Sequence, residues 1–555
     1  MSMLSGIGVS RGFATGPAVV VSPPPAFDPA EPVATDQPAA SARVRAVLHD
    51  VADGLRARAE TAPDNARPVL EAGAMIAGDP ALADTIEALL ATMGPTRAVH
   101  EAAGQYAALL ESLGGYMAER VTDLMDVRDR AIARLSGVPE PGVPTLTEPS
   151  ILVARDLAPA ETALLDASLC LALVTEAGGP TSHTAILAAQ LGIPAVVQVH
   201  GLAVTPGTLL AVDGGSGQVI IDPSPEVRTG FAAKQARRAT MLGDSRAPGA
   251  TKDGHPVALL ANIGTLADAE TAAAQAVEGV GLFRTEFLFL DRADAPAVAE
   301  QTATYTAVLR AFAPRHVVVR TLDAGADKPL AFADLGAEAN PALGRRGLRL
   351  GRARTDLLDD QLDALAAAYA ATGADLWVMA PMVATAAEAA WFAERVRARG
   401  LPRAGVMIEV PAAALRSRQV LQAVDFASLG TNDLGQYTMA ADRLQGELAD
   451  LLDPWQPAVL DVIAAACAGA TALGKPVGVC GEAGGDPGLA LVLAGLGVTS
   501  LSMATPKVRA VRTVLAAHTL AQCQEMAAAA RAATGPAEAR AAVLALADPV
   551  LTELL

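Results

Sequence analysis

Arginines and carboxylates recur in the second half of the chain, many of them where an apolar, β-type run ends. Guanidinium groups present fixed pairs of donors that match the oxygens of phosphate and carboxylate. Four such arginines therefore predict a site for a small ligand that carries both groups. The arginines are Arg284, Arg320, Arg346 and Arg443, and the other polar residues at the ends of the runs are Glu286, Asp323, Asn432, Cys480 and Glu482.

Two carboxylates in the same region have the chemistry of a hard-cation site. Glu409 and Asp433 each follow an apolar run. Two carboxylates, with substrate oxygens and water completing an octahedron, are the usual surroundings of Mg²⁺. The sequence therefore predicts a Mg²⁺ site at Glu409 and Asp433.

A histidine in the first half of the chain is a candidate phosphate carrier. His183 follows a glycine pair and begins a helix-patterned run in EAGGPTSHTAILAAQLGIPAVV. Backbone N–H groups at the start of a helix, with the hydroxyls of Thr181 and Ser182, would stabilise a phosphate on the imidazole. A simple capping contact at the helix start is the alternative interpretation.

Eight apolar runs alternate with Ala-rich, helix-patterned segments after residue 255. Eight strands that alternate with helices over about 300 residues are typical of a (β/α)8 barrel, whose active site lies at the carboxyl ends of its strands. An open doubly wound sheet is the alternative, although no GxGxxG motif follows the first run. The expected strands are 256–263, 279–286, 316–323, 376–383, 405–412, 426–433, 476–483 and 498–505.

The first half of the chain has a different pattern. Residues 5–21 and 143–223 contain short β-type runs, residues 36–135 are apolar at helical spacing, and residues 226–241 form a charged, Ala-rich segment. We therefore predict an α/β multidomain protein with four parts. These parts are an α/β domain (1–30 and 141–225), a helical subdomain (31–140), a linker helix (226–252) and the barrel (253–555).

Composition excludes several classes of function. A formal net charge of −18 argues against nonspecific binding of nucleic acid, which needs a basic surface. Charged residues, Gly or Pro interrupt every apolar stretch before the roughly 20 residues that cross a bilayer, so no membrane insertion is expected. The start of the chain does not have the pattern of a secretory signal, and we expect a cytoplasmic protein. Four cysteines without a CxxC pair predict neither a disulfide framework nor a zinc site.

Several motifs together resemble one family. The stretch GGPTSHTAILAAQLGIPAVV resembles the phosphohistidine loop of enzyme I of the phosphoenolpyruvate (PEP)-dependent sugar phosphotransferase system, which pyruvate phosphate dikinase and PEP synthase share. GLFRTEFLF, RTLDAGADKP, NPALGRRGLRL, MIEVPAA, SLGTNDLGQYTMAADR and GVCGEAGGDP are similar to that family's barrel motifs, in the same order. The resemblance covers essentially the whole chain. It implies a swivelling phosphohistidine α/β domain with an inserted helical subdomain, followed by a (β/α)8 barrel.

The resemblance also implies roles for individual residues. His183 would take the phosphoryl group of PEP on Nε2 and pass it to the phosphocarrier protein HPr, and Thr162 matches a residue that hydrogen-bonds this ring. Cys480 matches the acid that protonates the enolate carbon to give pyruvate. The matched PEP-binding positions are Arg284, Arg320, Arg346, Asn432, Asp433 and Arg443, the matched Mg²⁺ ligands are Glu409 and Asp433, and the expected supporting residues are Thr181, Ser182, Lys328 and Glu482.

The resemblance further implies an HPr-docking surface on the helical subdomain and a homodimer formed through the barrel. Pro180 stands where the family often has a basic residue, which leaves one cation fewer beside the phosphohistidine. Cationic neighbours favour a thiolate at Cys480, so proton donation would require bound PEP and Glu482 to raise the pKa of this thiol.

Two other functions can be weighed against the sequence. A dikinase or PEP synthase needs a further ATP-binding domain, and the segment before residue 143 has no P-loop and is too helical for one. A noncatalytic regulator would have lost His183, Cys480 or a metal carboxylate, and all of these residues are present.

Overall fold

The computed structural model divides into two compact units, residues 1–235 and 236–555, which are described separately. It describes residues 2–554 with the exception of 23, 24, 26, 62–66, 114, 145, 156, 158–164, 166, 167, 180–183, 186, 187, 189, 190, 244, 291, 326–329, 334, 335, 337 and 444.

The first unit contains a mixed sheet of eight strands in the order β1-β8-β7-β3-β4-β5-β6-β2. Strands β3 to β6 are parallel, and the strands at both edges are antiparallel to their neighbours. Residues from the start of the chain therefore pair with residues beyond 150, as the predicted discontinuous domain requires. The strands are β1 (Ser2–Ser5), β2 (Ile7–Ser10), β3 (Phe13–Val20), β4 (Ser150–Ala154), β5 (Cys170–Thr175), β6 (Ala195–Val197), β7 (Leu209–Asp213) and β8 (Gln218–Ile221).

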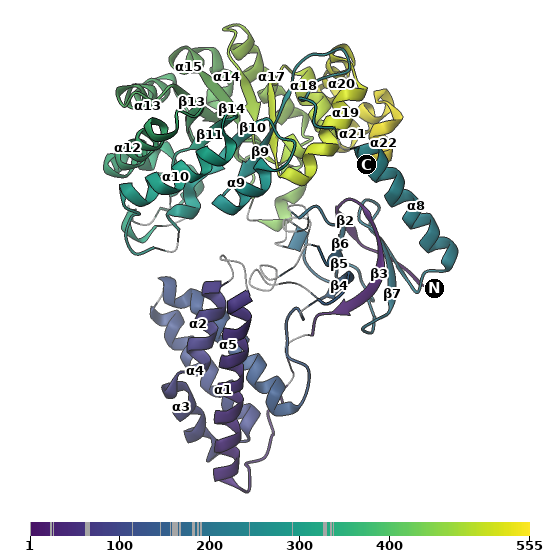
Figure 1. The fold of residues 1–555 in the computed structure, drawn as a ribbon, viewed down its shortest axis with the longest axis vertical. Coiled ribbons are helices and arrows are strands. Elements are labelled where there is room, and N and C mark those ends of the chain that lie inside the picture. The colour runs from purple at the N-terminus through teal and green to yellow at the C-terminus, as the bar shows by residue number, and fades with distance from the viewer. Residues whose placement is uncertain are drawn as a thin grey trace. The chain divides into compact units, whose positions relative to one another are not determined.

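Helices occupy the segment between β3 and β4 (Figure 1). Apolar residues at helical spacing form their own core, which includes Val44, Ile86, Val99 and Ile132. The side chain of Asp79 caps the start of one helix by accepting from the N–H of Ala81 at 2.8 Å. The helices are α1 (Gln37–Thr61), α2 (Arg67–Ala77), α3 (Pro80–Leu90), α4 (Pro95–Leu113) and α5 (Gly115–Ser136), and α8 (Pro225–Leu242) follows the sheet.

The second unit contains a closed barrel of eight parallel strands, which confirms the predicted (β/α)8 barrel. All eight expected runs contain a strand, but most of the strands end several residues before the runs do. Most of the polar residues at the ends of the runs therefore lie in the segments that follow the strands, whereas Arg284 and Arg320 are still strand residues. The strands are β9 (Ala258–Ile263), β10 (Gly279–Arg284), β11 (His316–Arg320), β12 (Leu376–Ala380), β13 (Arg403–Ile408), β14 (Phe426–Leu429), β15 (Val477–Val479) and β16 (Ser500–Met503).

Helices surround the barrel (Figure 1). Alternate strand residues such as Val317, Val378 and Ile408 pack against the helices in one large core. The longer helices are α9 (Leu266–Ala273), α10 (Val298–Phe312), α12 (Thr355–Thr372), α13 (Ala386–Ala398), α16 (Thr431–Met439), α17 (Pro457–Thr471), α18 (Pro487–Gly495), α19 (Val508–Ala517), α20 (Leu520–Ala532) and α21 (Pro536–Leu546). No helix among the described residues is long and apolar enough to span a membrane.

The interior of the barrel is filled by a separate set of apolar side chains. These residues alternate along the strands with those that face the helices, and Cys480 belongs to their cluster. Gly405 lies in β13 opposite Phe426, and a Cβ on this glycine would overlap the Phe426 ring. Absence of a side chain at Gly405 thus makes room for the aromatic ring. The interior residues are Leu282, Val318, Met379, Met407, Phe426 and Cys480, with Trp377 packed against them.

The close packing of Gly405 and Phe426 leads to a stability prediction. Gly405→Ala should lower the free energy of unfolding of the barrel by about 1 to 3 kcal/mol, because an overpacked core forces neighbouring atoms to move. In a Phe426→Leu background the same substitution should cost clearly less. Urea unfolding of the four proteins in this double-mutant cycle measures the coupling, and equal costs in both backgrounds would contradict this packing.

Candidate functional site

The carboxyl ends of the barrel strands bring the charged candidates together. Arg284 and Arg320 are the last residues of β10 and β11, and Glu409 and Cys480 directly follow β13 and β15. Asp433 lies in the first turn of α16, which follows β14. Because all eight strands are parallel, these ends meet at one rim of the barrel.

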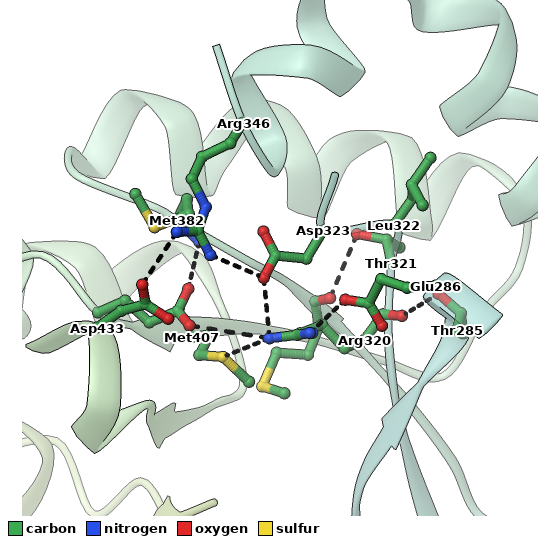
Figure 2. Close-up of polar contacts among 12 residues, drawn as sticks. Thr285, Glu286, Arg320, Thr321, Leu322, Asp323, Arg346, Met382, Met407 and Asp433 are labelled. Atoms are coloured by element: carbon green, nitrogen blue, oxygen red, sulfur yellow. Dashed lines mark hydrogen bonds and ion pairs between the residues drawn. The ribbon is translucent and has the colours of Figure 1, made fainter. Parts of the chain in front are cut away.

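Arg320 is a buried cation at this rim, and three carboxylates surround it (Figure 2). Its Nη2 contacts Glu286, and its Nη1 lies 3.1 Å from Asp323 Oδ2 and 3.9 Å from Glu409 Oε1. The same Nη1 contacts Met407 Sδ at 3.6 Å. Since Arg320 is only 7% exposed, these carboxylates compensate for the loss of hydration of its guanidinium group.

Arg346 is a second buried cation, and it shares a carboxylate with Arg320. Its Nη2 lies 3.2 Å from Asp323 Oδ2, and its Nη1 donates to Asp433 Oδ1 at 3.0 Å. Arg443 approaches the other oxygen of Asp433 at 3.6 Å. Asp323 therefore holds two arginines in one arrangement, a role that the sequence-based assignment missed. Its position three residues after Arg320, where the run ends, was the available signal.

The Glu409 carboxylate is almost completely buried. It is 1% exposed, and its Oε2 accepts the N–H of Met382 at 2.8 Å. Burial, together with the nearby carboxylates of Asp323 and Asp433, raises the pKa of Glu409 to about 8. The Met382 backbone that donates to it has φ of 57°, a strained conformation for a residue with a side chain.

The residues at the rim fit a divalent cation. The charges of the four arginines are nearly balanced by four carboxylates, which belong to Glu286, Asp323, Glu409 and Asp433. The protein alone therefore has little excess positive charge for a ligand with several negative charges. A cation at Glu409 and Asp433 would supply that excess and relieve the repulsion that raises the pKa of Glu409. No group of three His, Cys, Asp or Glu side chains suited to a metal occurs among the described residues. A Mg²⁺ ion held by Glu409 and Asp433 would take its other ligands from ligand oxygens and water, as Mg²⁺ sites commonly do.

The Cys480 thiol is buried at the centre of the rim. It is 2% exposed, and its Sγ contacts the carbonyl oxygen of Leu429 at 3.6 Å. Burial raises the pKa of Cys480 to about 11, although the Ser428 hydroxyl and two arginines act in the opposite direction. The expectation of a thiolate before ligand binding was wrong, because loss of hydration outweighs the cationic neighbours.

The remaining rim residues are more exposed. Asn432 Oδ1 accepts the N–H of Glu482 at 3.3 Å, and the Glu482 carboxylate pairs with Lys507 at 3.2 Å. Arg284 pairs with no carboxylate in the described part of the chain, and it acts on the Cys480 thiol through its charge. The Glu482 carboxylate is thus engaged by a lysine.

Five of the residues predicted from the sequence lie outside the described residues, so their predicted roles stay predictions. They are Thr162, Thr181, Ser182, His183 and Lys328.

Three family models match successive parts of the chain. Their descriptions are PEP-utilising enzyme, N-terminal (residues 5–120), PEP-utilising enzyme, mobile domain (146–217), and PEP-utilising enzyme, PEP-binding domain (238–520). The last match contains all of the charged rim residues described above. The barrel and the segment around His183 thus match two different domains of one family.

Individual proteins are similar over nearly the whole chain. A phosphoenolpyruvate-protein phosphotransferase from Streptomyces coelicolor is 53% identical over 98% of this chain and 99% of its own length. A protein of the same name from Haloferax volcanii is 40% identical over 87% of this chain and 88% of its own. A solution structure of enzyme I is similar to part of the chain. The match covers 42% of this chain and 98% of that one, with 32% identity and a TM-score of 0.38.

The raised pKa of Glu409 leads to a prediction about metal binding. Below pH 8 a proton occupies this carboxyl and competes with the metal, so the affinity for Mg²⁺ should rise by up to about tenfold per pH unit toward pH 8 and then level off. Calorimetric titrations from about pH 6 to about pH 9 should also detect the released proton. Glu409→Gln has no proton to release and should bind weakly at every pH, whereas pH-independent binding by the unchanged protein would contradict the prediction.

Proposed function

Because the chain belongs to the phosphoenolpyruvate-protein phosphotransferase (enzyme I) family of PEP-utilising enzymes, we propose that it transfers the phosphoryl group of PEP to its own His183 and then to HPr, releasing pyruvate. The observation that carries this proposal is the cluster of buried, carboxylate-held arginines around Glu409, Asp433 and Cys480 at the barrel rim.

The negative charges of PEP match the arginines of this rim. Its phosphate and carboxylate would be bound by Arg284, Arg320, Arg346 and Arg443, with the Asn432 amide as a further donor. Asp323 orients both Arg320 and Arg346, so their guanidinium groups need little rearrangement when PEP binds. Glu409 and Asp433 would hold Mg²⁺, which when bound neutralises charge on the phosphoryl oxygens.

The Cys480 thiol suits the second half of the reaction. Loss of the phosphoryl group leaves the enolate of pyruvate, and its carbon must gain a proton. With a pKa of about 11 the thiol keeps its proton at neutral pH until such a base forms beside it. Cys480 would then transfer the proton to carbon and complete pyruvate.

The phosphoryl group must then leave the barrel. His183 belongs to the segment matched by the mobile-domain model, and movement of this domain about hinges near 141–148 and 224–255 would carry the phosphohistidine to HPr. The helical subdomain would provide the docking surface for HPr. We further propose that the chain forms a homodimer through its barrel and acts in the cytoplasm as the first step of sugar uptake.

The function is tested first at the nucleophile. His183→Ala should abolish labelling of the protein by PEP with a labelled phosphoryl group, while His200→Ala, an exposed histidine of the same unit, should label normally. The label should be stable to alkali and labile to acid, and HPr should remove it. Labelling that persists in His183→Ala would assign the nucleophile to another residue.

The proton donor is tested separately. Cys480→Ser should lower the rate of pyruvate release by about 10²-fold, because a hydroxyl is a far weaker acid than a thiol, with little loss of PEP affinity. Cys467→Ser replaces an equally buried thiol in α17, away from the rim, and serves as the control. Near-normal pyruvate release per phosphorylated HPr in Cys480→Ser would show that another group supplies the proton.

A further inference from the structure

A chain of buried side-chain hydrogen bonds lies behind the ends of β10 and β11. Its central residue, Gln361 of α12, is completely buried on a helix face that is otherwise apolar. The amide Nε2 donates to Thr285 Oγ1 at 3.0 Å and to the Tyr305 hydroxyl at 3.0 Å. The amide Oε1 accepts the backbone N–H of Leu322 at 2.9 Å.

The chemistry of the partners determines the direction of each bond. A backbone N–H can only donate, so the oxygen of the Gln361 amide faces Leu322 and the nitrogen faces the two hydroxyls. The Thr285 hydroxyl, which accepts from Gln361, uses its single proton to donate to the carbonyl of Arg320 at 2.8 Å (Figure 2). The amide of Gln361 therefore reaches the backbone of Arg320 through one intervening hydroxyl.

The other end of the chain remains within α10 and the turn before it. The Tyr305 hydroxyl donates to Gln301 Oε1 at 3.2 Å, and Gln301 Nε2 donates to the carbonyl of Pro296 at 2.9 Å. Burial raises the pKa of Tyr305, so its hydroxyl stays a neutral donor. The hydrogen bonds given for the buried Gln301 side chain thus stay within α10 and the turn before it.

The contacts of Gln361 lie where the pairing of the two strands stops. Arg284 and Arg320 are the last residues that pair between β10 and β11. Thr285 lies between Arg284 and Glu286, and Leu322 lies between Arg320 and Asp323. Beyond the last backbone pair, the Gln361 amide therefore joins the two segments that carry these four charged groups.

We propose that Gln361 is a positioning residue for PEP binding. It keeps the Arg320 guanidinium in place between Glu286 and Asp323. The inference rests on the proposed function, because it requires that Arg320 binds PEP. Arg320 has to match an anion with a fixed fork of donors, so a small displacement of its backbone weakens every bond that the fork makes. Loss of the amide would free the end of β11 to shift.

A purely structural role for Gln361 predicts a different result, and Gln301 provides the matched comparison. Gln361→Met and Gln301→Met each remove a buried amide, with similar volume, from the same hydrogen-bond chain, and both should lower thermal stability. Only Gln361→Met should raise the KM for PEP, by about tenfold, because only its amide holds the strand ends. The assay is the initial rate of pyruvate release by the full-length protein with Mg²⁺ and HPr.

A second pair of variants decides the question if Gln361→Met does not fold. Thr285→Val removes the hydroxyl that joins Gln361 to Arg320, whereas Thr285→Ser retains it. The valine variant should raise the KM for PEP, and the serine variant should restore a value closer to that of the unchanged protein.

The outcomes separate this inference from the proposed function. If the unchanged protein releases no pyruvate from PEP, the proposed function fails and the inference fails with it. A different result is that the unchanged protein is active while Gln361→Met and Gln301→Met change the KM for PEP equally. Equal changes of this KM in Thr285→Val and Thr285→Ser are the corresponding result for the second pair. Either result overturns only the inference. A rise in KM confined to Gln361→Met and Thr285→Val supports it.

Discussion

The arrangement of the barrel rim depends on how two buried guanidinium groups are neutralised. A buried charge is tolerated only with a partner, because the protein interior cannot replace the water that it loses. Arg320 and Arg346 meet this requirement through Asp323, which lies within 3.2 Å of both. The need for such partners explains why a site rich in arginines also contains several carboxylates.

The same lack of water controls the two acidic groups at the centre of the site. Burial raises the pKa of Glu409 to about 8 and that of Cys480 to about 11, so both can be neutral near pH 7 before a ligand binds. Under the proposed function, Glu409 would lose its proton to the binding metal and Cys480 would lose its proton to the enolate. Loss of hydration, more than the number of neighbouring charges, therefore determines the pKa values of these two groups.

The supporting structure explains how short segments after the strands hold their positions. Most of the polar residues lie just beyond the last backbone pairs of β10, β11 and β14, where the barrel itself no longer constrains them. Hydrogen bonds of side chains replace the backbone hydrogen bonds between strands that are missing there. The Gln361 amide does so from α12, and the Glu409 carboxylate does so by accepting the backbone N–H of Met382. A precise site on a barrel thus requires polar residues in the surrounding helices.

The sequence alone determined the fold class and most of the candidate residues, because both depend on local pattern. Alternation of apolar runs with helical segments predicted the barrel, and arginines or carboxylates at the ends of runs identified Arg320, Glu409 and Asp433. Only the tertiary structure decided which charges pair, since Asp323 and Arg346 are 23 residues apart and Arg346 and Asp433 are 87 apart. It also decided the burial that raises the pKa of Cys480 and the hydrogen bonds that join Gln361 to the ends of the two strands. Burial and contacts between distant segments arise from packing, which spacing along the chain does not encode.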